Sequence, residues 1–218
     1  MSKDTTQIDE RLADYVAQHG TGRDDVLLQV ERETAELGGL ANMQTGPAQA
    51  ALLELLVRMV GARRAVEVGT FTGYGAIRIA RGLASDGSLL CCEFDEHWAE
   101  VTRRNVDAAG IGDRVEIRVG PALDTLRSLP LERAFDFAYL DGDKPGYQAY
   151  YDELVPRLRA GGLLAIDNVL MDGRVLDPPD GDDGARAVAQ LNDRIPTDDR
   201  VESVMLGMGD GLTLVRRR

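Results

Sequence analysis

The sequence predicts an α/β fold in which a mostly parallel, seven-stranded sheet carries helices on both faces and follows a group of N-terminal helices. Up to about residue 60, apolar residues recur at three- and four-residue spacing, which is typical of amphipathic helices. From Arg64 onward short β-type runs alternate with helical segments, and this alternation favours a parallel sheet. The last two runs, RVESVMLG and GLTLVRR, are separated only by MGD, which predicts a strand pair with one strand antiparallel to the rest.

Three helices are predicted before the sheet, over residues 8–18, 24–37 and 47–60. Asp24 or Asp25 suits the cap of the second helix, and Pro47 suits a first helical position. The linker GGLANMQTG between the second and third helices is too short to separate domains. We therefore expect one domain over residues 1–218, in which residues 1–60 cover the site or a partner subunit and residues 61–218 form the α/β core.

The core elements follow one another in a regular order. The β-type runs are AVEVG, SLLCCEF, RVEIRVG, FDFAYLD and GLLAID, and the helical segments between them are GAIRIARGL, EHWAEVTRRNVDAAG, ALDTLRSL and YQAYYDELVPRL. Residues 168–184 are rich in Pro and Gly and exceed an ordinary connection, so we expect a loop over the site. Cys91 and Cys92 are adjacent in a β-type run, where successive side chains point to opposite faces, which predicts two buried thiols without a disulfide between them.

Composition and charge exclude several classes of partner. The net charge of -12 disfavours partners held through phosphates, nucleic acids above all, because such binding needs clustered Lys and Arg. No stretch approaches the roughly 20 apolar residues that a membrane helix needs, and the N-terminus has no apolar core of signal-peptide length. We expect a cytoplasmic protein with no nucleic-acid partner and no membrane partner.

Polar side chains stand at the ends of several predicted strands. Glu93 ends one apolar run and Asp141 another. The run GGLLAI leads straight into Asp167 and Asn168, and we expect its strand to hold both of these side chains rigidly. In an open parallel sheet, ligands bind beyond the carboxyl ends of the strands. We therefore expect these polar groups to share one site. Turn formation explains Asp141 alone, or Asp167 and Asn168 alone. It does not explain all three together with the glycine spacing of the turn described next.

The first strand leads into the turn EVGTFTGYG, whose glycines let the backbone approach a ligand. The spacing E-x-G-x-x-x-G lacks the second glycine of the dinucleotide fingerprint G-x-G-x-x-G, which lies close to a pyrophosphate. Glu93, at the end of the second strand, suits an acceptor for a ribose diol. A nucleoside without a diphosphate therefore fits this turn better than NAD does.

At this point the chain resembles the cation-dependent O-methyltransferases of the catechol and caffeoyl-CoA type, which use S-adenosylmethionine and have the Rossmann-like class I methyltransferase fold. The motifs that carry the resemblance are ANMQT, VEVGTFTGYG, VGPALDTL, FDFAYLDGDKPGY, GGLLAIDNVLMDG and GDGLTLVRR, in this order. The resemblance implies a cofactor pocket formed by Met43, Thr45, Glu67, Gly69, Thr70, Gly75, Glu93, Ala122 and Asp143. It also implies a divalent cation bound by Asp141, Asp167 and Asn168, and it points to a homodimer.

The chemistry of the side chains agrees with this implied cation site. Two carboxylates and an amide oxygen form a hard, all-oxygen donor set that suits Mg²⁺, with Mn²⁺ as a substitute. His19 and His97 are expected on helix surfaces, so a zinc site is not predicted. Asp141 and Lys144 are the predicted catalytic residues, the first through the cation and the second as the base that takes the acceptor's proton. A surface charge is the alternative role for Lys144.

Some positions depart from the family pattern, in which a hydroxyl residue is common at Gly75 and an alanine at Gly142. A tryptophan and an asparagine are common at Met171 and Asp172, so the acceptor is left open. The acidic segment DPPDGDD makes a small phenol or catechol a better acceptor than a polyanionic acyl-CoA. Two alternatives remain: an NAD(P)-dependent oxidoreductase on a similar sheet, and a non-catalytic protein that binds S-adenosylmethionine. We expect the apolar N-terminal helices to form the contact of a homodimer.

Overall fold

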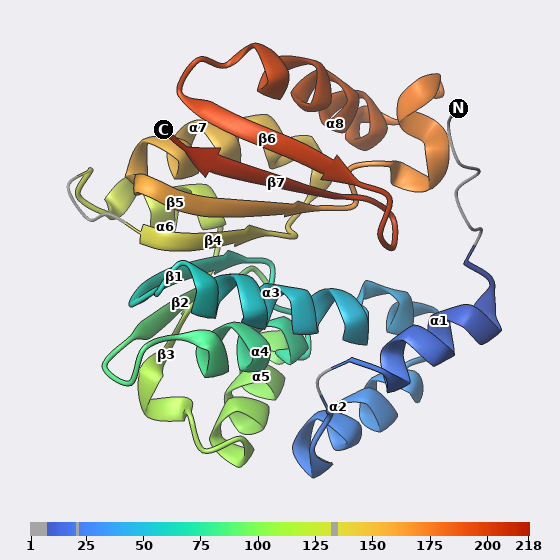
Figure 1. Ribbon diagram of the computed structural model, residues 1–218, viewed down its shortest axis with the longest axis vertical. Coiled ribbons are helices and arrows are strands. Elements are labelled where there is room, and N and C mark those ends of the chain that lie inside the picture. The colour runs from blue at the N-terminus through green and yellow to red at the C-terminus, as the bar shows by residue number, and fades with distance from the viewer. Residues whose placement is uncertain (1–7, 21, 132–134) are drawn as a thin grey trace.

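A seven-stranded sheet forms the centre of the computed structural model, which describes residues 8–20, 22–131 and 135–218. The strand order is β3-β2-β1-β4-β5-β7-β6 (Figure 1). The strands are β1 (Arg64–Val68), β2 (Ser88–Glu93), β3 (Val115–Val119), β4 (Phe135–Leu140), β5 (Leu158–Asp167), β6 (Val201–Leu206) and β7 (Leu212–Arg217). The first five pair in parallel, whereas β7 is antiparallel to both β5 and β6. The predicted fold class is confirmed.

Helices pack on both faces of this sheet. They are α1 (Glu10–Gln18), α2 (Asp25–Ala35), α3 (Pro47–Met59), α4 (Tyr74–Gly82), α5 (Glu96–Ala108), α6 (Ala122–Ser128), α7 (Tyr147–Arg157) and α8 (Asp183–Arg194). Helices α2 to α5 contact one another on one face, and α6, α7 and α8 do so on the other. Figure 1 shows α1 beside the N-terminal part of α3, which it contacts. Within the described ranges, no helix has the length and apolarity needed to cross a membrane.

Local sequence signals explain where several helices begin. The Asp24 carboxylate accepts a hydrogen bond from the Leu27 amide at 3.1 Å and so caps α2, and Pro47 is the first residue of α3, both as predicted. Helix α8 was not predicted. Asp182 caps it by accepting from the Ala185 amide at 2.9 Å, but the Pro- and Gly-rich run before it hid this start.

Alternate residues of the inner strands face two separate apolar clusters. Cys92 belongs to the cluster under α6, α7 and α8, whereas Cys91 belongs to the cluster under α2, α3 and α4. Both thiols are buried and free, as the period-two pattern predicts. Because these two clusters are closely packed, the strands give the residues at their carboxyl ends fixed positions.

Candidate active site

A cavity of about 1670 Å³ lies at the carboxyl ends of the parallel strands. It spans the point between β1 and β4 where the strand order reverses, which is where open α/β sheets bind ligands. Every site residue predicted above lines it: Met43, Thr45, Glu67, Gly69, Thr70, Gly75, Glu93, Ala122, Asp141, Asp143, Lys144, Asp167 and Asn168. Helix α1 adds Ala13 and Val16, so part of the N-terminal helical region covers this cavity.

The glycine-rich turn after β1 forms one wall of the cavity, and its glycines are required by space. Gly69 has a φ of 83°, and a Cβ there would collide with the carbonyl oxygen of Asp141. A Cβ at Gly75 would lie 2.5 Å from Oε1 of the buried Glu67. The family's hydroxyl residue at position 75 therefore has no room beside Glu67 as it stands here.

Gly69→Ala is expected to destabilise the protein and to weaken cofactor binding, because the left-handed backbone and the collision with Asp141 act together. The matched control is Gly110→Ala, since Gly110 has a φ of 69° but nothing within 4 Å of an added Cβ. The control isolates the backbone cost, about 1–2 kcal/mol. Urea unfolding of both variants measures the difference, and equal losses would contradict the close approach at Gly69.

Glu93 organises the glycine-rich turn as well as facing the cavity. Its Oε2 accepts hydrogen bonds from the amides of Thr70 and Phe71 at 3.0 and 2.9 Å, and its Oε1 accepts one from the Asp95 amide at 3.0 Å. The sequence predicted only an acceptor for a ribose diol here. A carboxylate oxygen accepts more than one hydrogen bond, so the structural contacts leave acceptor capacity for a ligand.

Aromatic residues that the sequence did not single out line the cavity beside this turn. Phe71 and Trp98 are in contact, with ring centroids 4.4 Å apart, and Phe94 follows Glu93 directly. Phe71 has a φ of 51°, and its carbonyl accepts a hydrogen bond from the Thr102 hydroxyl at 2.8 Å. Flat π-faces next to a ribose acceptor suit a nucleobase. Trp98 is the only tryptophan of the chain, so its fluorescence reports on this wall directly.

The acidic end of the cavity is formed by neighbouring parallel strands. Asp141 follows β4 and Asp167 ends β5, as predicted. Asn168 lies one residue past the strand with a φ of 51°, so the strand itself does not hold it, in contrast to the prediction. Burial raises the pKa of the Asp141 carboxyl to about 7. The positive charge of Lys144 lowers this pKa in part, whereas the negative charge of Asp167 raises it further.

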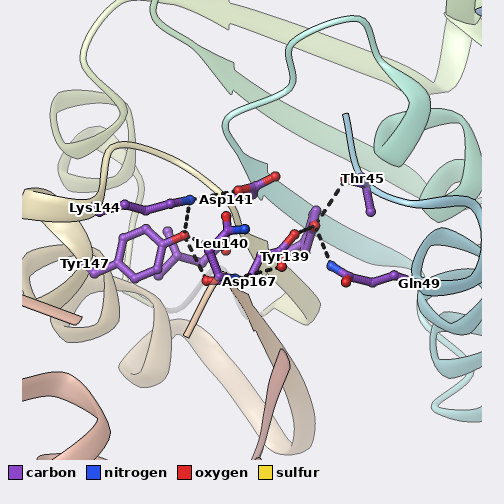
Figure 2. A network of polar contacts seen from close by, with 9 residues as sticks. Thr45, Gln49, Tyr139, Leu140, Asp141, Lys144, Tyr147 and Asp167 are labelled. Carbon is purple, nitrogen blue, oxygen red and sulfur yellow. Dashed lines mark hydrogen bonds and ion pairs between the residues drawn. The ribbon is translucent and has the colours of Figure 1, made fainter. Parts of the chain in front are cut away.

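Lys144 lies beside these carboxylates, on the short 3-10 helix Lys144–Gly146. Its Nζ donates hydrogen bonds to Oδ1 of Asp141 at 2.9 Å and to the Tyr147 hydroxyl at 2.7 Å. The Tyr147 hydroxyl in turn donates to the backbone carbonyl of Asp167 at 3.2 Å. Figure 2 shows Lys144 and Tyr147 together on one side of the two carboxylates. A surface location for Lys144 is therefore wrong, because the amine faces the cavity and contacts the acidic end.

Tyr139 reaches Asp167 from the other side. Its hydroxyl donates to Oδ2 of Asp167 at 2.5 Å and also contacts Thr45 Oγ1 at 3.1 Å and Gln49 Nε2 at 3.3 Å (Figure 2). Burial, together with the charges of Asp141 and Asp167, raises the pKa of Tyr139 well above its usual value. No sequence signal indicates this role, because Tyr139 stands inside an apolar run that is typical of core residues.

The segment between β5 and α8 lines the cavity, as predicted, but it is not wholly irregular. The 3-10 helix η4 (Met171–Leu176) interrupts it, with a kink at Asp172 and Gly173. Met171 and Arg174 contribute to the cavity, and Arg174 is paired with Asp182 at the cap of α8. The turn between β6 and β7 adds Met208 and Asp210, which the sequence did not single out.

The donor set suits a hard cation more than a soft one. In the described part of the chain, no group of three or more His, Cys, Asp or Glu side chains is placed to hold a metal ion. A cation site formed by Asp141 and Asp167 therefore needs the side-chain amide oxygen of Asn168 as a further donor. Oxygen donors of this kind are typical of Mg²⁺ and Mn²⁺ sites. His97 lies exposed on α5, as predicted.

Comparison with known proteins agrees with this geometry. The profile of a family described as O-methyltransferase matches residues 17–218. Tricin synthase 1 of Oryza sativa subsp. japonica is 37% identical over 188 residues, which cover 80% of this chain and 75% of that protein. The catechol O-methyltransferase of Niastella koreensis is 34% identical over 204 residues, covering 93% of this chain and 92% of the other.

Solved structures share the whole architecture. The O-methyltransferase from Bacillus cereus, crystallised in complex with SAH, matches with a TM-score of 0.88 at 32% identity, covering 95% of this chain and 97% of the other. The family match sets aside an NAD(P)-dependent oxidoreductase, which the glycine spacing had already disfavoured. With the motifs, the strand order and the relatives in agreement, the chain belongs to the O-methyltransferase family and is an enzyme with the class I methyltransferase fold.

Proposed function

We propose that this enzyme transfers the methyl group of S-adenosylmethionine to one hydroxyl of a small catechol-like acceptor and needs a divalent cation, Mg²⁺ or in its place Mn²⁺. One observation carries the proposal. The cavity that contains the glycine-rich turn also contains two carboxylates, an amide and a lysine at the ends of two neighbouring strands. The nucleoside pocket and the hard-cation site of this proposal would therefore share one cavity.

The assignment of the cofactor rests on the wall formed by the turn after β1 and the end of β2. The residues assigned to it are those that the family resemblance implied, and Phe71 and Trp98 join them beside Glu93. The Bacillus cereus O-methyltransferase, with SAH bound, supports this assignment, because SAH is what S-adenosylmethionine becomes when it has lost its methyl group.

A divalent cation fits the acidic end of the cavity. Asp141 pairs with Lys144, whereas Asp167 takes hydrogen bonds from neutral groups, so the two carboxylates keep a net negative charge. We assign Asp141, Asp167 and Asn168 as ligands that would relieve this charge. When bound, the cofactor supplies a methyl group on a positively charged sulfur, and the cation favours the ionised form of an acceptor hydroxyl.

The residues of the chain supply the proton chemistry and the orientation. Lys144 Nζ, in its neutral form, takes the proton of the acceptor hydroxyl, and Tyr147 holds that nitrogen at the acidic end. With the proton held on Lys144, the acceptor oxygen would be placed to take the methyl group from the cofactor. The bond between that carbon and the cofactor's sulfur would break and SAH would leave, and proximity and alignment would supply much of the acceleration. Met171 and Met208 line the cavity with apolar surface that excludes water from the reacting atoms.

Charge in the cavity favours a small acceptor without phosphates. The lining includes the acidic side chains of Glu93, Asp143 and Asp210 besides the two proposed ligands, and Arg174 is already paired with Asp182. A polyanionic acyl-CoA would meet repulsion here that a neutral catechol does not. The relatives include both a catechol O-methyltransferase, of Niastella koreensis, and caffeoyl-CoA O-methyltransferases, so the charge of the cavity carries this choice of acceptor.

The experiment that tests the proposal is incubation with methyl-labelled S-adenosylmethionine and a panel of catechols, simple phenols and acyl-CoA esters, with and without EDTA. The expected result is label in catechols only, lost with EDTA and restored by Mg²⁺ or Mn²⁺. Labelling that persists in EDTA would contradict the cation. Cofactor binding without any labelled product would favour the non-catalytic alternative.

We further propose that the enzyme is a homodimer that uses the N-terminal helices. Leu55 and Met59, one turn apart on α3, are 53% and 72% exposed, and Tyr15 on α1 is 58% exposed. Exposed apolar groups of this kind mark contact surfaces. Sedimentation equilibrium should give twice the mass of one chain at micromolar concentration, and Met59→Glu should shift the equilibrium toward one chain. The mass of a single chain for the unaltered protein would contradict the proposal.

A further inference from the structure

The Tyr139 side chain joins the N-terminal helical region to the acidic end of the cavity. It belongs to β4, where it pairs with Glu67 of β1 and Ala165 of β5, and it is fully buried. Its hydroxyl contacts Thr45, Gln49 and Asp167 (Figure 2). Thr45 precedes α3 and Gln49 lies in its first turn, so three separate segments of the chain meet at one oxygen atom.

The direction of these hydrogen bonds follows from what each group can do. A phenolic hydroxyl has one proton to donate and accepts through its oxygen. The Gln49 side chain contacts it through Nε2, which can only donate. The Asp167 carboxylate can only accept, so the phenolic proton points to Oδ2, and Thr45 must be the second donor. The hydroxyl is therefore saturated, and its proton has one available direction.

The same contact restricts the Asp167 carboxylate. Oδ2 accepts from Tyr139, and Oδ1 accepts from the backbone N–H of Asn168 at 2.7 Å. With one donor on each oxygen, the plane of the carboxylate is held, and each oxygen keeps acceptor capacity for another partner. The ring cannot swing away, because the Tyr139 side chain is fully buried within the sheet.

We propose that Tyr139 is a positioning residue for the cation site, holding the Asp167 carboxylate in the orientation that binds the ion. The proposal rests on the proposed function, since it takes Asp167 as a ligand. Groups that hydrogen-bond to a metal ligand orient it, and losing one lowers metal affinity without altering the ligand itself. Tyr139 does not itself line the cavity, so its role there is exerted through Asp167.

The test is Tyr139→Phe, which removes the hydroxyl and keeps the ring. Titration calorimetry with Mn²⁺ on the full chain, without acceptor, should give a cation affinity about 10–100-fold lower than that of the unaltered protein. Cofactor affinity, followed by Trp98 fluorescence, should stay close to its original value. In turnover assays the concentration of Mn²⁺ for half-maximal rate should rise, and saturating Mn²⁺ should restore most of the rate.

Tyr151→Phe is the matched control. Tyr151 is also fully buried, and its hydroxyl also donates to an aspartate, Oδ2 of Asp198 at 3.0 Å, but neither residue lines the cavity. It therefore reproduces the general loss of a buried tyrosine hydrogen bond, and its cation affinity should not change. An equal loss of affinity in both variants would overturn the positioning role, as would an unchanged affinity in Tyr139→Phe.

Asp167→Asn separates this inference from the proposed function. If Asp167→Asn binds Mn²⁺ as well as the unaltered protein, the cation site is wrong and the inference fails with it. If Asp167→Asn loses binding while Tyr139→Phe keeps it, the inference alone fails. Should Tyr139→Phe not fold, Gln49→Met carries the test, because it removes one donor that fixes the proton's direction. A loss of Mn²⁺ affinity in Gln49→Met, smaller than the about 10–100-fold expected for Tyr139→Phe, supports the proposal. An unchanged affinity in Gln49→Met overturns it.

Discussion

Replacing Asp167 or Asp141 by alanine is expected to abolish turnover while cofactor binding stays measurable. Each change removes one of two carboxylates proposed to hold the cation, and the remaining donors are too few to bind it tightly. A cation of this kind is worth several kcal/mol in the transition state, so the rate should fall by about 10³-fold or more. The cofactor wall contains neither carboxylate group, so its affinity should change much less.

The measurement combines labelled methyl transfer with calorimetry of S-adenosylmethionine binding. Asp210→Asn is the control, because Asp210 lines the same cavity and accepts a hydrogen bond from the Asp172 amide at 2.6 Å but is not a proposed ligand. This control tests whether the loss of any one negative charge in the cavity is enough to abolish turnover. The rate of Asp210→Asn should fall far less than the rates of Asp141→Ala and Asp167→Ala. Full activity of Asp167→Ala in EDTA would rule out the cation mechanism.

Lys144→Ala is expected to lower turnover by about 10²-fold or more, the usual range for a lost general base, with little change in substrate or cofactor affinity. A group that takes the proton only as the methyl transfers affects the chemical step more than binding. The structure supplies a competing role, because Lys144 also pairs with Asp141 at 2.9 Å and could act by holding that carboxylate. The two roles differ in whether the side chain must lose a proton.

Lys144→Arg distinguishes them, since arginine keeps the positive charge and the pairing with Asp141 but stays protonated. A base predicts that the arginine variant is as slow as the alanine variant. Electrostatic anchoring predicts that the arginine variant keeps most of its rate. A nitro-substituted catechol, whose hydroxyl ionises more readily, should lose less rate in Lys144→Ala than catechol does.

Sequence periodicity predicted most of the architecture of this protein, with the exception of helix α8. Alternating β-type and helical runs predict a parallel sheet because each pattern buries its apolar face in only one kind of element. The glycine spacing after β1 disfavoured a dinucleotide. The acids at the carboxyl ends of β4 and β5 indicated a shared site, because parallel strands end at the same edge. These signals lie in short stretches of sequence, so they can be recognised in this one chain without a comparison of sequences.

Only the tertiary structure decided how the site is held. Tyr139 reads as one more apolar strand residue, yet the fold brings Thr45 and Gln49 to its hydroxyl and points its proton at Asp167. Glu93 likewise binds the turn between β1 and α4 as well as facing the cavity, and Asn168 leaves the strand. Such contacts join residues many positions apart, and hydrogen-bond geometry depends on where their backbones meet. Periodicity predicts which elements form and which face is buried, whereas partners at these distances exist only once the layers have packed.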